Sequence, residues 1–308
     1  MSTAIPTTLP HGNTARRLDW VHLPAPVRTA VEKRLGAPVV QAVSQDAGFT
    51  PGFASVLTDA TGASTFVKAA SVQAQRGSAA SYRAEARRLR TLNGWVPAPR
   101  LRWAEEVADW VVLGIEYVDA RPPRRPWTEP DLTAATTMLT CLAASATPPP
   151  CLGLSDVGEE LADLAGSWQE LDHLAHAEEA TALADRFAEL VVGDTLVHTD
   201  VRDDNLLLRA DGTVLLCDWS EPMRGPNWLD SLLLLAAARG DGLEVDPTTH
   251  PLLGAAEDEA IDSALALFAG YGLERSELPA PPAMPHLREF QRWQGETCWA
   301  WLAERRGW

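Results

Sequence analysis

The spacing of hydrophobic residues changes near residue 120, and this change separates two parts of the chain. In the first part, short alternating or continuous apolar stretches favour β-strands, whereas in the second part apolar residues mostly recur at helical spacing. We expect strands over 38–45, over 54–70 on both sides of a turn at Asp59–Gly62, over 109–120 and, as a pair, over 205–209 and 213–217. Helices are expected over 24–36, 78–94, 130–146, 154–175, 177–192, 228–239, 255–271 and 284–305.

A proline-rich stretch, "RPPRRPW" at residues 121–127, lies at this change and is the expected hinge. It would separate a small, strand-rich N-terminal lobe, residues 23–120, from a larger helical lobe, residues 121–308. Residues 1–22 are expected to be loosely ordered. The pattern therefore predicts an α+β fold made of two lobes.

The charge of the chain bears on its partners. The sequence carries 42 acidic against 26 basic residues, a formal net charge of −16. Such a surface repels phosphate backbones, so we expect no nucleic-acid partner. It would attract a cationic small molecule, but acidity also serves simply to keep a protein soluble. Charge alone leaves both interpretations open.

The cysteines and the N-terminus indicate a reducing compartment. Four scattered cysteines form no CxxC pair, so we expect neither a structural zinc site nor a disulfide framework. Residues 1–20 lack the apolar segment of a signal peptide. The longest apolar run, residues 228–238, is too short to cross a bilayer. We therefore expect a cytoplasmic protein without membrane association.

One polar cluster interrupts apolar surroundings. The stretch "LVHTDVRDDNLLL", residues 196–208, places His198, Asp200 and Asn205 between two apolar ends. Thirteen residues after Asn205, "LLCDWS" supplies Asp218 at the end of an apolar strand. Carboxylate and amide oxygens are the ligands that magnesium prefers. Ordinary turn residues are the alternative for the loop.

Two charged residues of the N-terminal part complete the pattern. "FVKA" puts Lys68 in a strand after a glycine-containing turn, and Glu85 follows in a helix. Taken alone, Lys68 is a solvated strand lysine. Glu85 in "EARRLR" also fits a solvated helix face with charge pairs at helical spacing.

The order and spacing of these residues resemble the catalytic loop, metal-binding aspartate and strand lysine of the protein-kinase-like fold. The chain is similar to the aminoglycoside phosphotransferase and choline kinase group of small-molecule kinases, in a branch of actinobacterial type. "GFTPGFASVL", "WVVLGIEYVDARPP" and "WAWLAERRGW" extend the resemblance over residues 38–308. It implies a bilobal fold with a small antiparallel sheet in the N-terminal lobe.

The resemblance also implies an activity. The protein would be an ATP-dependent phosphotransferase that moves the γ-phosphoryl group to a hydroxyl of a small molecule. Asp200 would accept the proton of that hydroxyl, and Asn205 and Asp218 would hold Mg²⁺. Lys68, oriented by Glu85, would bind the α- and β-phosphates.

Other polar residues near the loop have secondary expected roles. His198 belongs to the catalytic group and would brace the loop rather than react. Arg202 corresponds to a basic or polar group near the transferred phosphate. Asp203 would meet a cationic substrate or stay solvated, and Asp204 is expected to be solvated. Asp230 resembles a helix-start aspartate that braces the loop, with a simple N-terminal helix charge as the alternative.

The sequence departs from the protein-kinase pattern in two places. "QDAGFTPGF" is not a G-x-G-x-x-G loop, so a phosphate cover would be built from Gly48, Phe49, Thr50 and Gly52. The metal motif is Asp-Trp-Ser, with Trp219 in place of the usual phenylalanine. No Ala-Pro-Glu motif follows, so protein substrates are not expected.

The nucleotide base and the acceptor leave weaker traces. The resemblance implies backbone contacts to adenine from Glu116 and Val118, and ATP against GTP stays open. Trp127 and Trp228 are candidate substrate contacts near the cleft. The tryptophans of the last helix recur at helical spacing and are expected in the core.

Three functions remain. The first is the phosphotransferase, for which aminoglycosides, other amino-bearing antibiotics or amino alcohols are candidate acceptors. The second is a catalytically silent kinase-fold protein that binds a nucleotide or ligand, which the irregular glycine loop favours. The third, a helical scaffold, does not explain why five polar residues fall in kinase order.

Overall fold

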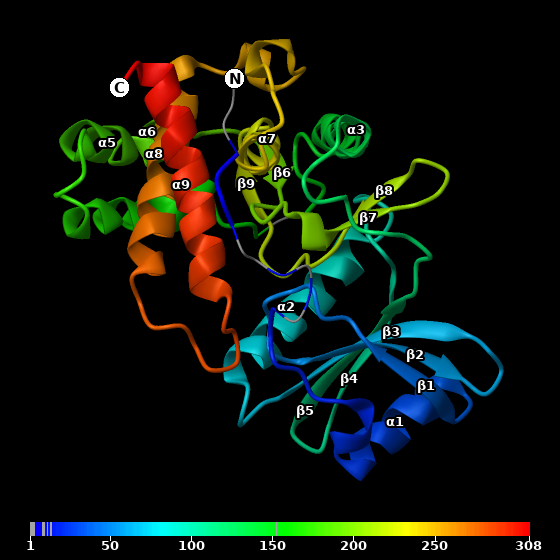
Figure 1. The fold of residues 1–308 in the computed structure, drawn as a ribbon. Helices are drawn as coiled ribbons and strands as arrows, with labels where there is room; N and C mark the ends of the chain where they lie inside the picture. Colours follow the sequence, from blue (N-terminus) through cyan, green and yellow to red (C-terminus); the bar gives the residue numbers. More distant parts are fainter. Residues whose placement is uncertain (1–3, 8–9, 11, 13, 152) are drawn as a thin grey trace.

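The computed structural model describes residues 4–7, 10, 12, 14–151 and 153–308. It consists of a lobe built on one sheet and a larger helical lobe, so the predicted α+β architecture is confirmed (Figure 1). None of the helices in the described residues combines the length and the apolarity that crossing a membrane requires.

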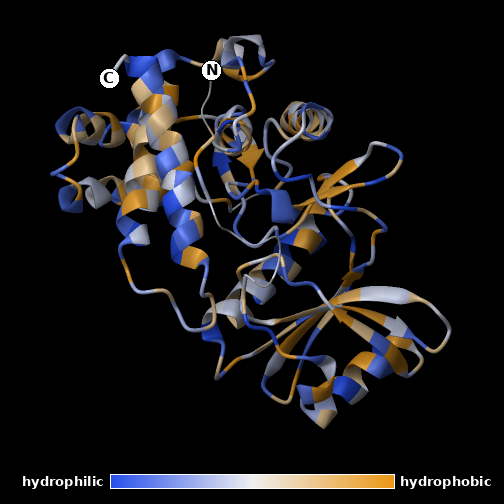
Figure 2. Ribbon diagram, in the orientation of Figure 1, coloured by the Kyte–Doolittle hydropathy of each residue, from blue (hydrophilic) through white to orange (hydrophobic). Residues whose placement is uncertain are grey.

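The N-terminal lobe is an antiparallel sheet with one helix packed on each face. The strand order is β1-β2-β3-β5-β4. Leu23, Val27 and Val31, in and before α1, pack on one face, and the apolar side of α2 packs on the other. Hydrophobic residues are interspersed with polar ones along the strands (Figure 2), and the inner strands β2, β3 and β5 are mostly buried. The bounds are α1 Ala25–Leu35, β1 Val39–Ser44, β2 Phe53–Asp59, β3 Ser64–Ser71, α2 Arg76–Leu92, β4 Leu101–Val107 and β5 Trp110–Glu116.

Alternation along β3 positions the strand lysine. Val67 and Ala69 contribute to the core beneath α1, whereas Ala70 contributes to the core on the α2 side. Because successive side chains of a strand point to opposite faces, Lys68 faces α2 together with Ala70. The sheet therefore directs Lys68 towards Glu85, which lies on the buried side of α2.

The C-terminal lobe is a helical assembly. Helices α8 and α9 lie along each other (Figure 1), and a side chain at Gly272 would meet the Gly295 backbone at 2.7 Å. Two glycines therefore allow these helices to approach closely. The helix bounds are α3 Glu129–Ser145, α4 Val157–Leu161, a 3₁₀ segment Ala162–Glu170, α5 Ala177–Ala184, α6 Phe187–Leu190, α7 Leu229–Gly240, α8 Asp258–Ser276 and α9 Leu287–Arg306.

Two short strand pairs support the loop of residues 198–205. β6, Thr195–Val197, pairs with β9, Met223–Gly225, immediately before the loop. β7, Leu206–Leu208, pairs with β8, Val214–Leu216, immediately after it. The apolar ends of the motif are thus two buried strands that fix both ends of a polar loop.

Several expected elements differ from the structure. β4 was not predicted because it is an edge strand whose side chains are mostly half-buried, which gives a weak hydrophobic pattern. β6 and β9 have three residues each, too few for a period to register. The helix expected over 154–175 is α4 followed by a 3₁₀ segment. The helix expected over 177–192 is divided into α5 and α6.

The described part of residues 1–22, expected to be loosely ordered, contacts both lobes. The Ile5 N–H donates to the Gly240 carbonyl at 2.8 Å, and the Arg16 N–H donates to the Ala283 carbonyl at 2.8 Å. The buried Thr14 hydroxyl lies 2.9 Å from the carbonyl oxygens of both Asp46 and Gly48. This segment therefore extends from the helical lobe to the loop between β1 and β2.

An ion pair anchors the connection between the lobes. Arg121 donates to Asp131, at the start of α3, at 2.9 and 2.6 Å, and the Arg124 N–H donates to the same carboxylate at 2.9 Å. The backbone of Arg121 also exchanges two hydrogen bonds with Leu208 of β7. The link after β5 is thereby tied to the strand that follows the polar loop.

We predict that Asp131→Asn lowers the free energy of unfolding at pH 7 by about 1–3 kcal/mol, the typical effect of a lost hydrogen bond to a charged group. The bonds from Arg121 hold the pKa of Asp131 below its usual value. The stability is therefore present above the usual pKa, about 3.9, and is lost as the pH falls through the lower folded value. Urea denaturation should show that the wild type has a higher free energy of unfolding than the variant at pH 7, and that this difference becomes smaller below pH ~4. Asp119→Asn, at an exposed position, is the control. A difference in unfolding free energy between the wild type and Asp131→Asn that does not change with pH would contradict the prediction.

Candidate active site

The polar loop is held from beneath by Asp230 and His198. Asp230, in the first turn of α7, accepts from the backbone N–H groups of His198 at 2.7 Å and Thr199 at 2.8 Å. His198 Nε2 lies 2.8 Å from the Cys217 carbonyl, and its ring packs edge-on against Trp219 at 4.8 Å. Both side chains are buried and fix the backbone at which the loop begins.

Asp200 projects from this loop into the cleft. Its side chain is 47% exposed. Arg202 Nη1 donates to both carboxylate oxygens at 2.7 Å. Asn205 Nδ2 donates to the Asp200 carbonyl at 2.9 Å and to Oδ2 at 3.1 Å. These contacts orient the carboxylate, and a carboxylate oxygen keeps lone-pair capacity for another donor.

Lys68 connects the sheet with the segment after β8. Its ammonium donates to Glu85 at 2.9 and 2.8 Å and to Asp218 Oδ1 at 3.3 Å. Lys68 is only 9% exposed and Glu85 is fully enclosed. Asp218 has φ of 65°, a conformation that non-glycine residues rarely adopt, which accords with strain at functional sites.

The electrostatics of this trio favour its charged form. Burial alone would lower the pKa of Lys68, but Asp218 and Glu85 together raise it above its ordinary value. Lys68 in turn lowers the pKa of Asp218 against the effect of burial. Burial raises the pKa of Glu85, and the lysine opposes this shift. A buried ammonium shared by two carboxylates is the result.

The irregular glycine loop, residues 45–53, covers the cleft as a turn between β1 and β2. A side chain at Gly52 would collide with the Tyr82 hydroxyl, so the close approach of the loop to α2 requires glycine. Phe49 packs against Phe290 of α9 with ring centroids 4.7 Å apart. The loop therefore contacts the helical lobe directly. Thr50 lies between these residues in the same turn.

Arg17 was not predicted as a site residue, because no motif or spacing distinguishes an arginine in a polar N-terminal segment. Its Nη2 donates to the Gly48 carbonyl at 2.7 Å. Burial lowers its pKa, while the charges of Tyr82, Asp46, Asp204 and Asp218 oppose the shift. A cation from the N-terminal segment therefore lies between the glycine loop and the carboxylates of the cleft.

Asp204, expected to be solvated, is instead buried in an ion pair. Arg202 donates from Nε and Nη2 to the two oxygens of Asp204 at 2.8 and 2.9 Å. Its guanidinium also lies 5.7 Å from the ring centroid of Phe49 and 5.4 Å from that of Phe290. Arg202 thus joins Asp200, Asp204 and both aromatic rings, a set that sequence distance does not reveal.

Asp203 points to another arginine. Arg125 donates to Asp203 at 3.1 Å and makes two bonds of 2.6 Å to Asp241. The Arg125 guanidinium stacks on the ring of Trp293 at 4.6 Å. Burial raises the pKa of Asp203, and the charge of Arg125 opposes that shift.

The predicted nucleotide-base contacts lie where the first lobe ends. Glu116 is the last residue of β5, and its N–H donates to the Arg100 carbonyl at 2.8 Å. Val118 follows in the link between the lobes and is buried. Their contact with a nucleotide base stays a prediction.

The predicted substrate tryptophans lie elsewhere. A cavity of about 160 Å³ opens beside Asp200, and neither Trp127 nor Trp228 lines it. They are 4% and 7% exposed and belong to the core, because each lies at or just before a helix start that packs inwards. Phe290 and Trp293 of α9, expected only as core, do line the cavity. Helical spacing cannot distinguish a core position from a cavity wall.

Asn205 and Asp218 are the residues whose free oxygens fit a magnesium ion. The Asn205 amide nitrogen is engaged with Asp200, which leaves its Oδ1, and Lys68 contacts only Oδ1 of Asp218. Across the described residues, no group of three or more His, Cys, Asp or Glu is arranged to hold a metal. Mg²⁺ is commonly bound by one or two protein ligands together with waters and substrate phosphates, so these two oxygens would suffice to hold it.

Comparison with known proteins gives one family. The model of the phosphotransferase enzyme family matches residues 47–272. That span includes Gly48 and Gly52 of the glycine loop, Lys68, the polar loop and Asp218. No curated protein sequence matches the chain.

Solved structures share the fold at low identity. An aminoglycoside phosphotransferase from Alicyclobacillus acidocaldarius is 17% identical with a TM-score of 0.54, over 87% of this chain and 92% of that one. A thermostable mutant of aminoglycoside phosphotransferase APH(4)-Ia, solved with ADP and hygromycin B, is 14% identical with a TM-score of 0.61, over 90% and 97%. A spectinomycin phosphotransferase, solved with ADP and spectinomycin, is 11% identical with a TM-score of 0.55, over 91% and 98%. The predicted kinase-like fold is therefore confirmed.

We predict that Lys68→Met lowers the free energy of unfolding by about 3–5 kcal/mol, because it leaves a buried carboxylate without its counter-charge. The double variant Lys68→Met/Glu85→Leu should recover most of this loss, since both buried charges are then removed. Urea denaturation of the ligand-free wild type, the two single variants and the double variant gives the unfolding free energies of this double-mutant cycle. Lys33→Met, at the chain's only other lysine and exposed on α1, is the control. Additive losses in the double variant would contradict a coupled pair.

Proposed function

The chain belongs to the phosphotransferase enzyme family, and from this membership we propose that it transfers the γ-phosphoryl group of magnesium-bound ATP to a hydroxyl of a small molecule. One observation carries the proposal. Lys68 bridges Glu85 and Asp218 at 2.8 and 3.3 Å, and Arg202 and Asn205 orient Asp200 in the same cleft. Phosphoryl transfer needs such positioning and charge neutralisation more than covalent help.

Asp200 is the proposed general base. Its carboxylate accepts the proton of the attacking hydroxyl while the acceptor oxygen forms a bond to the γ-phosphorus. The bond between that phosphorus and the β–γ bridging oxygen breaks, and ADP leaves with the electron pair. His198 and Asp230 hold the loop that carries the base.

Charge neutralisation is divided among several side chains. In this proposal Lys68 holds the α- and β-phosphates, and Arg202, which contacts Asp200 at 2.7 Å, is the cation beside the transferred group. Mg²⁺, held by Asn205 and Asp218, supplies further charge neutralisation when bound. Gly48, Phe49, Thr50 and Gly52 form the cover over the phosphates.

The remaining assignments follow from the lobes. Residues 23–120 act as the nucleotide-binding lobe, with adenine against the backbone of Glu116 and Val118, and residues 121–308 carry the acceptor site. GTP is the alternative phosphate donor. Aminoglycosides and other amino-bearing compounds were the acceptor classes expected from the sequence. The four cysteines are free thiols, which suits a cytoplasmic enzyme.

A silent nucleotide-binding protein is the second candidate function. Arg202 engages both oxygens of Asp200 at 2.7 Å, and a carboxylate held in this way is less accessible to a substrate hydroxyl. ADP release in the presence of acceptors distinguishes the two functions, because only the enzyme turns over.

We predict that Asp200→Asn reduces turnover by about 10²–10⁴-fold, the usual contribution of a positioned base. The variant keeps its affinity for magnesium-bound nucleotide, because Asp200 is not among the residues proposed to hold it. ADP release and calorimetry measure the two effects separately. Asp211→Asn, in the exposed β7–β8 turn, is the matched control. Full turnover by Asp200→Asn would refute the assignment.

We predict that Arg17→Ala raises KM for ATP by about tenfold or more, the scale of one lost charge-assisted contact. The reason is that the Arg17 guanidinium lies against the Gly48 carbonyl, beside the carboxylates of the cleft. Steady-state kinetics and nucleotide titration measure the effect. The exposed neighbour Arg16→Ala should leave KM unchanged, and equal effects from both variants would contradict a direct role.

A further inference from the structure

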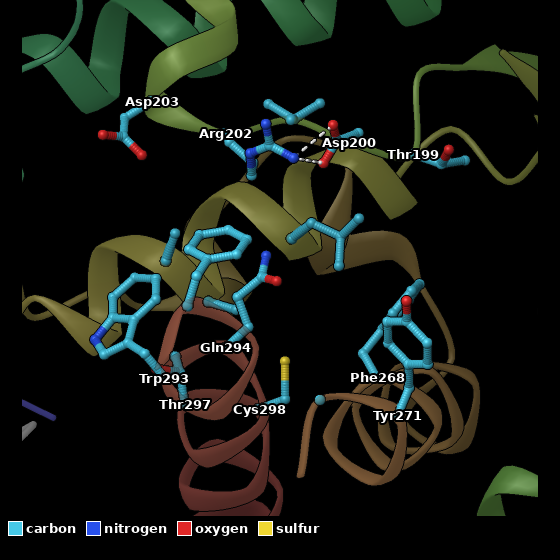
Figure 3. Close-up of a pocket in the computed structure, with 16 residues that line it drawn as sticks. Thr199, Asp200, Arg202, Asp203, Phe268, Tyr271, Trp293, Gln294, Thr297 and Cys298 are labelled. Atoms are coloured by element: carbon cyan, nitrogen blue, oxygen red, sulfur yellow. Dashed lines mark hydrogen bonds and ion pairs between the residues drawn. The ribbon is translucent and has the colours of Figure 1, made fainter. Parts of the chain in front are cut away.

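The cavity beside Asp200 suits one compact ring. Its volume is about 160 Å³, and an engineered protein cavity of about 150 Å³ stays dry and binds benzene. Thr199 and Asp200 lie at one end of the cavity and Cys298 at the other (Figure 3). A body of several linked sugar rings exceeds this space, whereas a single six-membered ring fits with its hydroxyl towards Asp200.

The wall of the cavity is mainly apolar and aromatic. Residues of α7, α8 and α9 contribute to it, and α8 and α9 lie below the loop that carries Asp200 (Figure 3). Burying apolar atoms against such a wall is favourable, at about 25 cal/mol per Å². The wall includes Leu233 and Ala237 of α7, Phe268 and Tyr271 of α8, and Phe290 and Trp293 of α9.

The carboxylates at the cavity already have cationic partners. Asp200 and Asp203 are the acidic residues among the described lining residues. Arg202 contacts Asp200 at 2.7 Å, and Arg125 contacts Asp203 at 3.1 Å. An ammonium group entering the cavity would lose its hydration without finding an unpaired carboxylate, which is costly. Both lining carboxylates are therefore already engaged in ion pairs, and each arginine also binds a second acid outside the lining, Asp204 or Asp241.

We propose that the acceptor is an uncharged alcohol with a compact apolar or aromatic ring, and that polycationic aminoglycosides are poor acceptors. This inference rests on the proposed function, because it names the acceptor of the same site. The ring occupies the cavity between α7, α8 and α9, and the hydroxyl lies against Asp200. The hydroxyl proton passes to Asp200, and the oxygen forms the new bond to the γ-phosphorus as ADP leaves.

Matched acceptors test the charge preference. 4-Methylbenzyl alcohol and 4-(aminomethyl)benzyl alcohol differ by one ammonium group on the same ring, and cyclohexylmethanol supplies a non-aromatic ring. Hygromycin B and spectinomycin are the amino-bearing antibiotics tested as acceptors. With Mg²⁺ and ATP in excess, ADP release should show kcat/KM at least about tenfold higher for the neutral alcohol than for its amine. Removing one buried methylene from the acceptor should cost about fourfold.

Two variants of the wall test the location. Ala237→Phe fills the cavity and should abolish use of the ring alcohols while leaving nucleotide affinity unchanged. Ala303→Phe, half-buried on α9 outside the cavity lining, is its control. Gln294→Glu adds a carboxylate of nearly the same shape to the wall and should shift the neutral-to-amine preference by about tenfold towards the amine. Gln169→Glu, at an exposed position outside the lining, makes the same change in net charge and is its control.

The outcomes separate this inference from the proposed function. Faster phosphorylation of the amine or of the aminoglycosides would overturn the inference and leave the phosphotransferase intact. Nucleotide binding without phosphorylation of any acceptor would refute the proposed function. In that case, calorimetric binding of 4-methylbenzyl alcohol to the ADP-bound protein, lost in Ala237→Phe, would still support the cavity assignment. Absence of such binding, without turnover, would overturn both.

Discussion

The buried contact of Lys68 with two carboxylates is the constraint on which the site depends. The lysine comes from β3, Glu85 from α2, and Asp218 from the segment after β8. A desolvated ammonium is tolerated only while both acids stay close, so the sheet, its covering helix and the helical lobe must keep one relative placement. The same requirement brings Asp218 beside the loop that carries Asp200 and Asn205. Stability and chemistry thus share one set of charges.

Much of the architecture could be predicted because its signals are local. Alternation along β2, β3 and β5, and the glycine after α1, gave elements close to those observed. The spacing of His198, Asp200, Asn205 and Asp218 identified the polar loop, since short strands on both sides fix its length. β4 and β9 escaped prediction because edge position and brevity leave little hydrophobic pattern. The division of the long predicted helices depends on tertiary packing.

The surroundings of the cavity beside Asp200 were harder to predict because they are assembled from distant segments. Arg202, Phe49 and Phe290 meet although Phe49 and Phe290 lie far apart in the sequence. Nothing in the helical spacing of α9 distinguishes Trp293, on the cavity wall, from Trp301, in the core. Two arginines pair with acids beside the cavity, and a pairing of this kind is visible only in three dimensions.

The N-terminal segment has a consequence for how the cleft exchanges its contents. Thr14 and Arg17 are fastened to the glycine loop, while Ile5 and Arg16 are fastened to the helical lobe. A rigid rotation of one lobe away from the other about residues 121–127 would stretch this tether across the opening. A wide separation of the two lobes therefore requires the N-terminal segment to detach first, whereas a small lateral displacement of one lobe does not. A wide opening of the cleft is thereby coupled to the release of these N-terminal contacts.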